Sequence, residues 1–127
     1  AQEKAEAGKP VLEAVKEALG DQVKEVRISS ILKSGACCLT ADGPITLEME
    51  KYFQRVDPEN AKSMKAQRVL ELNPDSAAFA ALSRAGESDR DKAARYAKLL
   101  YAQAQLIAGL PLEDPAGYTE LVCSLMN

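Results

Sequence analysis

The chain has 127 residues, of which 46% are hydrophobic, and this length suits one domain with one core rather than two. Its formal net charge of −3 excludes a non-specific nucleic-acid binder, whose affinity would come from a basic surface that neutralises phosphates. Neither a long apolar run nor a secretory leader is visible, so we expect a cytoplasmic protein that contacts no membrane and no nucleic acid.

The chain contains no histidine, which removes the commonest general base and the usual transition-metal ligand. Cys37 and Cys38 are adjacent on an expected strand, so their side chains should point to opposite faces. We interpret these two and Cys123 as small buried side chains in a reducing compartment. A thiol enzyme built on Cys37 or Cys38 is an alternative that no Cys-x-x-Cys spacing supports. We therefore expect no catalytic residue, metal site or cofactor in this chain.

The first half of the chain is expected to contain two helices and two strands. Residues 1–9 are polar and are expected to be a linker from an upstream domain, whereas residues 10–127 form the domain itself. Turn residues and apolar periodicity then predict the elements of this half. These are a helix from Pro10 to Gly20, strands over 23–29 and 36–40, and an amphipathic helix over 45–56.

The second half begins with a strand over 68–72 that turns directly into a helix. Asn73 is the expected N-cap and Pro74 the first helical residue, where its missing N–H costs nothing. The helices expected to follow are 76–85 with a stop at Gly86, 88–109 with Ser88 as N-cap, and a last helix that begins at Asp114-Pro115. This order predicts an α+β fold in which helices cover a small three-stranded sheet.

The long helix over 88–109 carries apolar residues at 4-3 spacing, which is a seam for a neighbouring helix. Its apolar arc is wider than the roughly 100° that one core-facing side requires. Burial within one subunit is one explanation, and contact with a second copy is the other. The last helix is too short to be stable alone. We expect the C-terminal helices of a homodimer to form a four-helix bundle through Ala97, Leu100, Tyr101, Ala104, Ile107, Tyr118, Leu121, Val122, Leu125 and Met126.

Several segments resemble a known family when they are read in order. The most specific is Glu71-Leu72-Asn73-Pro74, and the others are Val23–Ser29, Ser34–Thr40 and Leu112–Pro115. Together they are similar to the C-terminal domain of the heat-shock protein 90 chaperones, in particular the bacterial HtpG type. The sequence shows no acidic tail of the kind that eukaryotic cytosolic members offer to helical-repeat co-chaperones, so we expect a bacterial-type or organellar member that does not dock such partners.

The resemblance implies the homodimerisation and client-contact domain of an ATP-dependent chaperone that assists protein folding in the stress response. ATP and Mg²⁺ would then be bound by domains upstream of this chain, which itself would be no enzyme. It also implies that the helix over 45–56 binds unfolded client proteins through Ile45, Met49, Tyr52 and Phe53. Periodicity alone favours a core role for that helix. A stand-alone α+β adaptor that binds a peptide without self-association is the alternative function.

Overall fold

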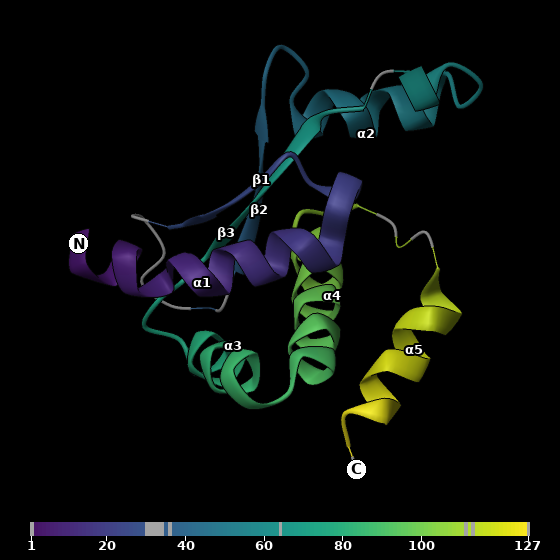
Figure 1. Ribbon diagram of the computed structural model, residues 1–127. Helices are drawn as coiled ribbons and strands as arrows, with labels where there is room; N and C mark the ends of the chain where they lie inside the picture. The colour runs from purple at the N-terminus through teal and green to yellow at the C-terminus, as the bar shows by residue number, and fades with distance from the viewer. Residues whose placement is uncertain are drawn as a thin grey trace.

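The structure of the chain is a computed structural model in which helices lie around a small sheet (Figure 1). It describes residues 2–29, 35, 37–63, 65–110, 112 and 114–126. Within these residues the elements are α1 (Gln2–Leu19), β1 (Glu25–Ile28), β2 (Cys37–Asp42), α2 (Leu47–Val56), β3 (Gln67–Leu72), α3 (Ala77–Ser88), α4 (Arg90–Ile107) and α5 (Pro115–Ser124). The fold agrees with the α+β class that the sequence predicts.

Strand β3 lies at the centre of the three-stranded sheet, parallel to β1 and antiparallel to β2. Val26 of β1 and Leu39 of β2 both lie opposite Leu70, and all three are buried. The next pair in the register, Arg27 and Glu71, is exposed and half-buried respectively. Because side chains alternate along a strand, one face of the sheet is apolar and the other is polar.

Helices α1 and α4 cover the apolar face of the sheet, and α3 packs against both of them (Figure 1). Burying each large apolar side chain in this core contributes roughly 1.5–3 kcal/mol. The small side chains of α4 allow its neighbours to approach closely. The core is formed by Val11, Val15, Leu19, Val23, Val26, Cys37, Leu39, Leu70, Leu72, Leu82, Ala97, Leu100, Tyr101, Ala104 and Leu110.

Helix α1 begins at Gln2 rather than at Pro10. Residues 2–9 are rich in Ala, Glu and Lys, which are among the strongest helix formers, so the helix continues through them although Pro10 donates no N–H. The segment expected to be a linker is therefore helical from Gln2 onward. Ala1, and Ala36 at the expected start of the second strand, lie outside the described residues.

Asn73 does not cap α3, because its side chain has other partners. Its amide group donates to the carbonyl oxygen of Gly35 at 2.9 Å, and its carbonyl oxygen accepts the N–H of Asp75 at 3.0 Å. Ser76 is the N-cap instead, with a hydroxyl that accepts the N–H of Phe79 at 3.1 Å. The turn before α3 is thus longer than the sequence predicts, and Asn73 ties the end of β3 to Gly35.

The junction between α3 and α4 also differs from the prediction. Helix α3 passes through Gly86 and ends at Ser88, whose hydroxyl donates to the carbonyl oxygen of Arg84 at 3.0 Å. Asp89 is the N-cap of α4, because its carboxylate accepts the N–H of Lys92 at 3.1 Å. A glycine inside a helix costs only roughly 0.5–1 kcal/mol relative to alanine, so Gly86 weakens α3 without ending it.

Gly109 terminates α4 in the left-handed region, with a φ of +82°. Its N–H donates to the carbonyl oxygen of Leu106 at 3.0 Å, and the N–H of Leu110 donates to that of Gln105 at 2.8 Å. These two bonds form a Schellman motif. A Cβ atom at position 109 would lie 3.3 Å from the Nζ atom of Lys51, so both the backbone and its surroundings favour glycine.

Helix α5 begins as the sequence predicts, with Asp114 as N-cap and Pro115 at the first position. The Asp114 carboxylate accepts the N–H of Gly117 at 3.0 Å, and a Cβ atom on Gly117 would collide with that carboxylate. The helix lies to the side of α4, away from α1 and α3 (Figure 1). None of its described residues is buried.

Replacing Gly109 with alanine should lower the free energy of unfolding by about 1–2 kcal/mol, because an L side chain is strained at positive φ and would press on Lys51. Gly86→Ala is the matched control. Position 86 is helical with open space around it, so that substitution should raise the free energy of unfolding by about 0.5–1 kcal/mol. Urea titrations followed by circular dichroism measure both, and changes of the same sign would contradict the assignment.

Candidate functional site

Helix α2 lies beyond the end of the sheet, away from α1 and α3 (Figure 1). It begins after Thr46, whose hydroxyl accepts the N–H of Met49 at 3.1 Å. This side-chain cap satisfies one of the free N–H groups of the first turn. The helix predicted over 45–56 is therefore present, with its start two residues later at Leu47.

Two stripes of opposite character run along α2. On the inward side, Glu50 is completely buried, although a charged side chain normally faces water. On the opposite side is a set of apolar residues, which we call the outward stripe: Met49, Tyr52 and Val56, with relative exposures of 40%, 52% and 58%. An amphipathic helix usually buries its apolar face. Here the apolar side chains face outward and the charged one faces inward.

The inward face is held by a buried ion pair. The Nη2 atom of Arg68 lies 2.6 Å from the Oε2 atom of Glu50, and the N–H of Ala66 donates to Oε1 at 2.9 Å. Arg68 also donates to the hydroxyl of Tyr101 at 2.8 Å, and that hydroxyl donates to the carbonyl oxygen of Gln22 at 3.2 Å. The network therefore connects α2, β3, α4 and the turn before β1.

The charge of Arg68 is stabilised by these contacts. Burial by itself would lower the pKa of Arg68, but the hydrogen bonds to Tyr101 and to Glu50 raise that pKa above its ordinary value. The guanidinium is consequently charged at any physiological pH. A buried guanidinium without its carboxylate would be strongly penalised, so Arg68 and Glu50 depend on each other.

Lys51 provides a second link between α2 and the body of the chain. Its Nζ atom donates to the carbonyl oxygen of Ala108 at 2.8 Å and lies 2.5 Å from the Oε1 atom of Glu48. A cation is favoured at the C-terminal end of a helix, where carbonyl groups lack intrahelical partners. Lys51 therefore fastens α2 to the last turn of α4.

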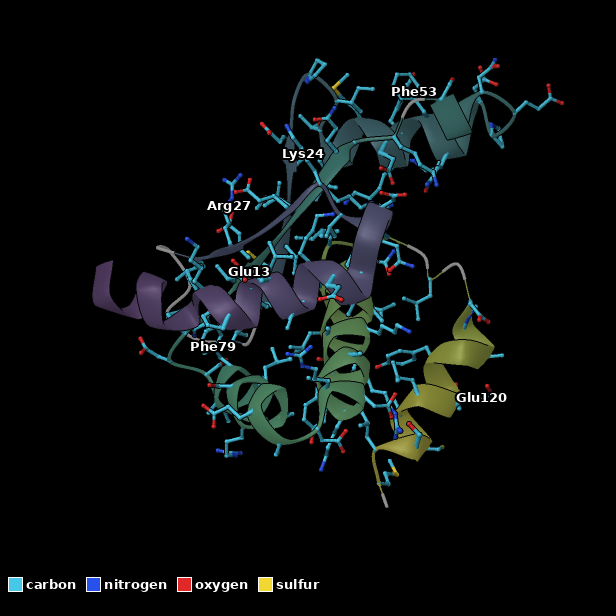
Figure 2. The ribbon with its side chains drawn as sticks, in the orientation of Figure 1. Glu13, Lys24, Arg27, Phe53, Phe79 and Glu120 are labelled. Carbon is cyan, nitrogen blue, oxygen red and sulfur yellow. The ribbon has the colours of Figure 1, made fainter. Side chains whose placement is uncertain are left out.

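The four residues expected to bind clients lie on or beside α2. Met49 and Tyr52 belong to the outward stripe, whereas Phe53 and Ile45 are half-buried. Phe53 lies on α2 (Figure 2). Its ring meets that of Tyr52 edge to face, with centroids 5.7 Å apart. Val56 is more exposed than any of the four. It follows Tyr52 by four residues, and this helical spacing is the signal that could have added Val56 to the predicted client-binding residues.

The residues expected at a dimer interface fall into two groups. In α4, Ala97, Leu100, Tyr101 and Ala104 are 0–7% exposed and pack in the core of their own chain. Their 4-3 spacing is thus used for contacts with α1, α3 and the sheet. Ile107, one turn farther along, is 73% exposed. In α5 the expected residues remain accessible: Met126, which follows the helix, is 76% exposed, and Tyr118, Leu121, Val122 and Leu125 are half-buried.

A cleft of about 1130 Å³ separates α5 from α4. On the α4 side it is lined by Ala102 and Gln105, and on the α5 side by Tyr118 and Leu121. The cleft explains why α5 buries none of its described residues, since the two helices are not closely packed along it. One side of α5 is therefore available for a further contact.

A sequence profile of the family described as "Hsp90 protein" matches residues 1–127. The chain belongs to the Hsp90 family. Curated relatives named "Chaperone protein HtpG" are 45% identical over 118 residues in Bacillus subtilis, 48% over 121 residues in Shouchella clausii and 43% over 122 residues in Clostridium perfringens. The matches cover 93%, 95% and 96% of this chain, but only 18%, 19% and 19% of those relatives.

The comparisons confirm the expected resemblance to the Hsp90 family and its HtpG type. An adaptor unrelated to chaperones, the alternative left open by the sequence, does not agree with this membership. The chain spans less than a fifth of the length of these relatives. No helix in the described part of this Hsp90 chain is both long and apolar enough to cross a membrane.

The cysteines of this Hsp90 chain lie in three different environments. Cys37 is buried and its pKa is raised to about 11, chiefly by burial. Burial and the negative charge of Glu71 also raise the pKa of Cys38. Cys38 is half-buried and Cys123 is exposed, contrary to the expectation that both are buried. A raised pKa disfavours the nucleophilic thiolate, so the structure gives no support to a thiol enzyme. Among the described residues, no three Asp, Glu or Cys side chains form a group that could hold a metal ion.

Iodoacetamide should therefore alkylate Cys123 quickly in the folded chain and leave Cys37 unmodified. At about pH 8, a pKa of about 11 leaves roughly one Cys37 in a thousand as thiolate. Mass spectrometry of the peptides measures both sites, and unfolding in urea should make them react alike. A Cys123→Ser variant is the control, because the fast reaction should disappear in it. Fast alkylation of Cys37 in the folded chain would contradict its burial and its raised pKa.

Proposed function

We propose that this chain is the C-terminal dimerisation and client-contact domain of an Hsp90-type chaperone that assists the folding of other proteins. The observation that carries the proposal is the outward stripe of α2. Met49, Tyr52 and Val56 are exposed on a helix that is held in place by polar contacts on its other side. The relatives' name, "Chaperone protein HtpG", supports the same function.

The outward stripe has the chemistry that binding of varied unfolded chains requires. Unfolded chains expose apolar side chains, whose removal from water is the main driving force for association. Methionine adapts its shape to irregular apolar partners, and tyrosine offers an apolar ring with a polar group at its end. We include the half-buried Phe53 and Ile45 as the base of this surface. Contact with a client would cover side chains that otherwise stay in water.

Dimerisation is proposed through the end of α4 and through α5. Ile107 and Met126 are largely exposed, and Leu121, Val122 and Leu125 of α5 are half-buried, with Leu121 lining the cleft. Burying each of these side chains against a second copy would contribute roughly 1.5–3 kcal/mol. A two-fold arrangement closes on itself, and the two helices of each chain would then form a four-helix bundle.

The dimer would serve the parts of the parent protein that lie outside this chain. We propose that ATP and Mg²⁺ bind in those parts, and that this chain binds no nucleotide and is no enzyme. Linking two ATPase arms through one dimer would keep them at high effective concentration and favour their contact during the reaction cycle. In this proposal the partners of the chain are a second copy of itself and unfolded client proteins.

Replacing Met49 and Tyr52 with serine should weaken binding of an unfolded chain about tenfold or more, because both contribute exposed apolar area. Reduced, carboxymethylated α-lactalbumin cannot fold and is a suitable fluorescent probe in anisotropy titrations. Surface substitutions usually change stability by within about 0.5 kcal/mol, so the melting temperature should stay nearly constant. Leu106→Ser removes an apolar side chain that is 49% exposed on α4 and serves as control. Unchanged probe affinity in the double variant would refute the client-contact role.

Replacing Leu121 and Leu125 with glutamate should convert the dimer to a monomer, because unpaired charge would be buried at the proposed contact. Sedimentation velocity over a range of concentrations measures the association. The matched control is Thr119→Glu with Cys123→Glu, which places the same two charges, with the same spacing, at exposed positions of α5. The interface would have to be placed elsewhere if the Leu121 and Leu125 variant sedimented as a dimer.

A further inference from the structure

Glu50 is completely buried on a helix whose opposite side is exposed and apolar. Its two carboxylate oxygens both have partners, the Nη2 atom of Arg68 at 2.6 Å and the N–H of Ala66 at 2.9 Å. One partner lies on β3 and the other lies immediately before that strand. The charged side of α2 is therefore attached to the sheet through fixed, directional contacts.

Stability alone does not explain a buried ion pair at this place. Replacement of such a pair by apolar residues of similar volume is often neutral or stabilising. In addition, α2 carries Met49, Tyr52 and Val56, which would gain from burial if the helix turned about its axis. That rotation would withdraw Glu50 and leave Arg68, whose side chain is only 10% exposed, without its carboxylate. The ion pair thus opposes a rotation that the hydrophobic effect favours.

The contact made by Lys51 supports the same orientation of α2. Neighbouring residues of an α-helix project about 100° apart, so contacts from positions 50 and 51 together restrict rotation about the helix axis. Lys51 reaches the carbonyl oxygen of Ala108 at 2.8 Å, while Glu50 reaches Arg68. Both contacts point the outward stripe away from the rest of the chain.

We propose that Glu50 and Arg68 are positioning residues that keep the outward stripe of α2 turned away from the core for the binding of unfolded chains. The inference rests on the proposed function of α2 and adds the device that maintains its binding surface. Without the pair, α2 rotates and buries part of the stripe against its own chain. The fraction of molecules that can bind then falls, and the apparent affinity falls with it.

A tryptophan introduced by Tyr52→Trp can report the orientation of α2, because the chain contains no tryptophan of its own. In this background, quenching of the introduced indole by acrylamide measures how accessible the outward stripe is. The test variant combines Glu50→Gln with Arg68→Gln, which removes both charges and leaves no unpaired ion. The control is Arg55→Gln, which removes one charge from the same helix at an exposed side chain.

In the double variant, the introduced indole should be quenched less and the affinity for carboxymethylated α-lactalbumin should fall about tenfold, as expected if about a tenth of the molecules keep α2 outward. The control variant should retain both the quenching and the affinity of its background. Unchanged quenching and affinity in the double variant would overturn the proposal. Increased quenching would also overturn it, because the pair would then only keep α2 folded. If the double variant fails to fold, Glu50→Gln alone is judged by the same two measurements.

Failure of this inference can be distinguished from failure of the proposed function. The client-contact role is tested by the Met49 and Tyr52 serine variant, in which Glu50 and Arg68 are intact. If that variant loses probe binding while the glutamine double variant retains it, the positioning role alone is refuted. If the serine variant binds the probe normally, the client-contact role is refuted, and indole quenching in the Tyr52→Trp background still reports whether the pair orients α2.

Discussion

The side chain of Arg68 joins elements that are far apart in the sequence. It projects from the central strand β3, pairs with Glu50 of α2 and donates a hydrogen bond to Tyr101 of α4. Neither a guanidinium nor a carboxylate is tolerated away from water without a partner. This requirement fixes α2 relative to the sheet and to α4. The outward stripe of α2 therefore depends on one small group of polar contacts.

The apolar core and the polar network have different roles in this fold. The core is built where α1, α3 and α4 meet the sheet, and burial there contributes most of the stability because it scales with the apolar area removed from water. The polar network buries little apolar area and instead fixes the orientation of α2. It holds α2 by Glu50 and Lys51, so that a helix with little apolar contact of its own keeps a defined orientation.

Membership of the Hsp90 family and the geometry of the chain support one functional hypothesis. The outward stripe of α2 is apolar, α5 carries the half-buried Leu121, Val122 and Leu125, and both lie outside the core. We propose different occupants for them, an unfolded client at α2 and a second copy at α5. Lys51 contacts Ala108, next to the exposed Ile107, so α2 is attached to the end of α4.

The sequence by itself determined the features that depend on neighbouring residues. The three strands, the presence of the helices and the cap at Asp114 follow from apolar periodicity and local turn chemistry.

Tertiary structure decided what each side chain contacts. Asn73 has the chemistry of a cap, but its amide group donates to the carbonyl oxygen of Gly35, and Ser76 caps α3 instead. The spacing of α4 predicts a seam, but it could not say whether the partner helix belongs to the same chain. Glu50 has the pattern of a solvent-facing residue, and Arg68, 18 residues away, together with the N–H of Ala66, makes its burial possible. Periodicity records which side of a helix is apolar, whereas the direction that side faces depends on the long-range polar partners that the fold brings to it.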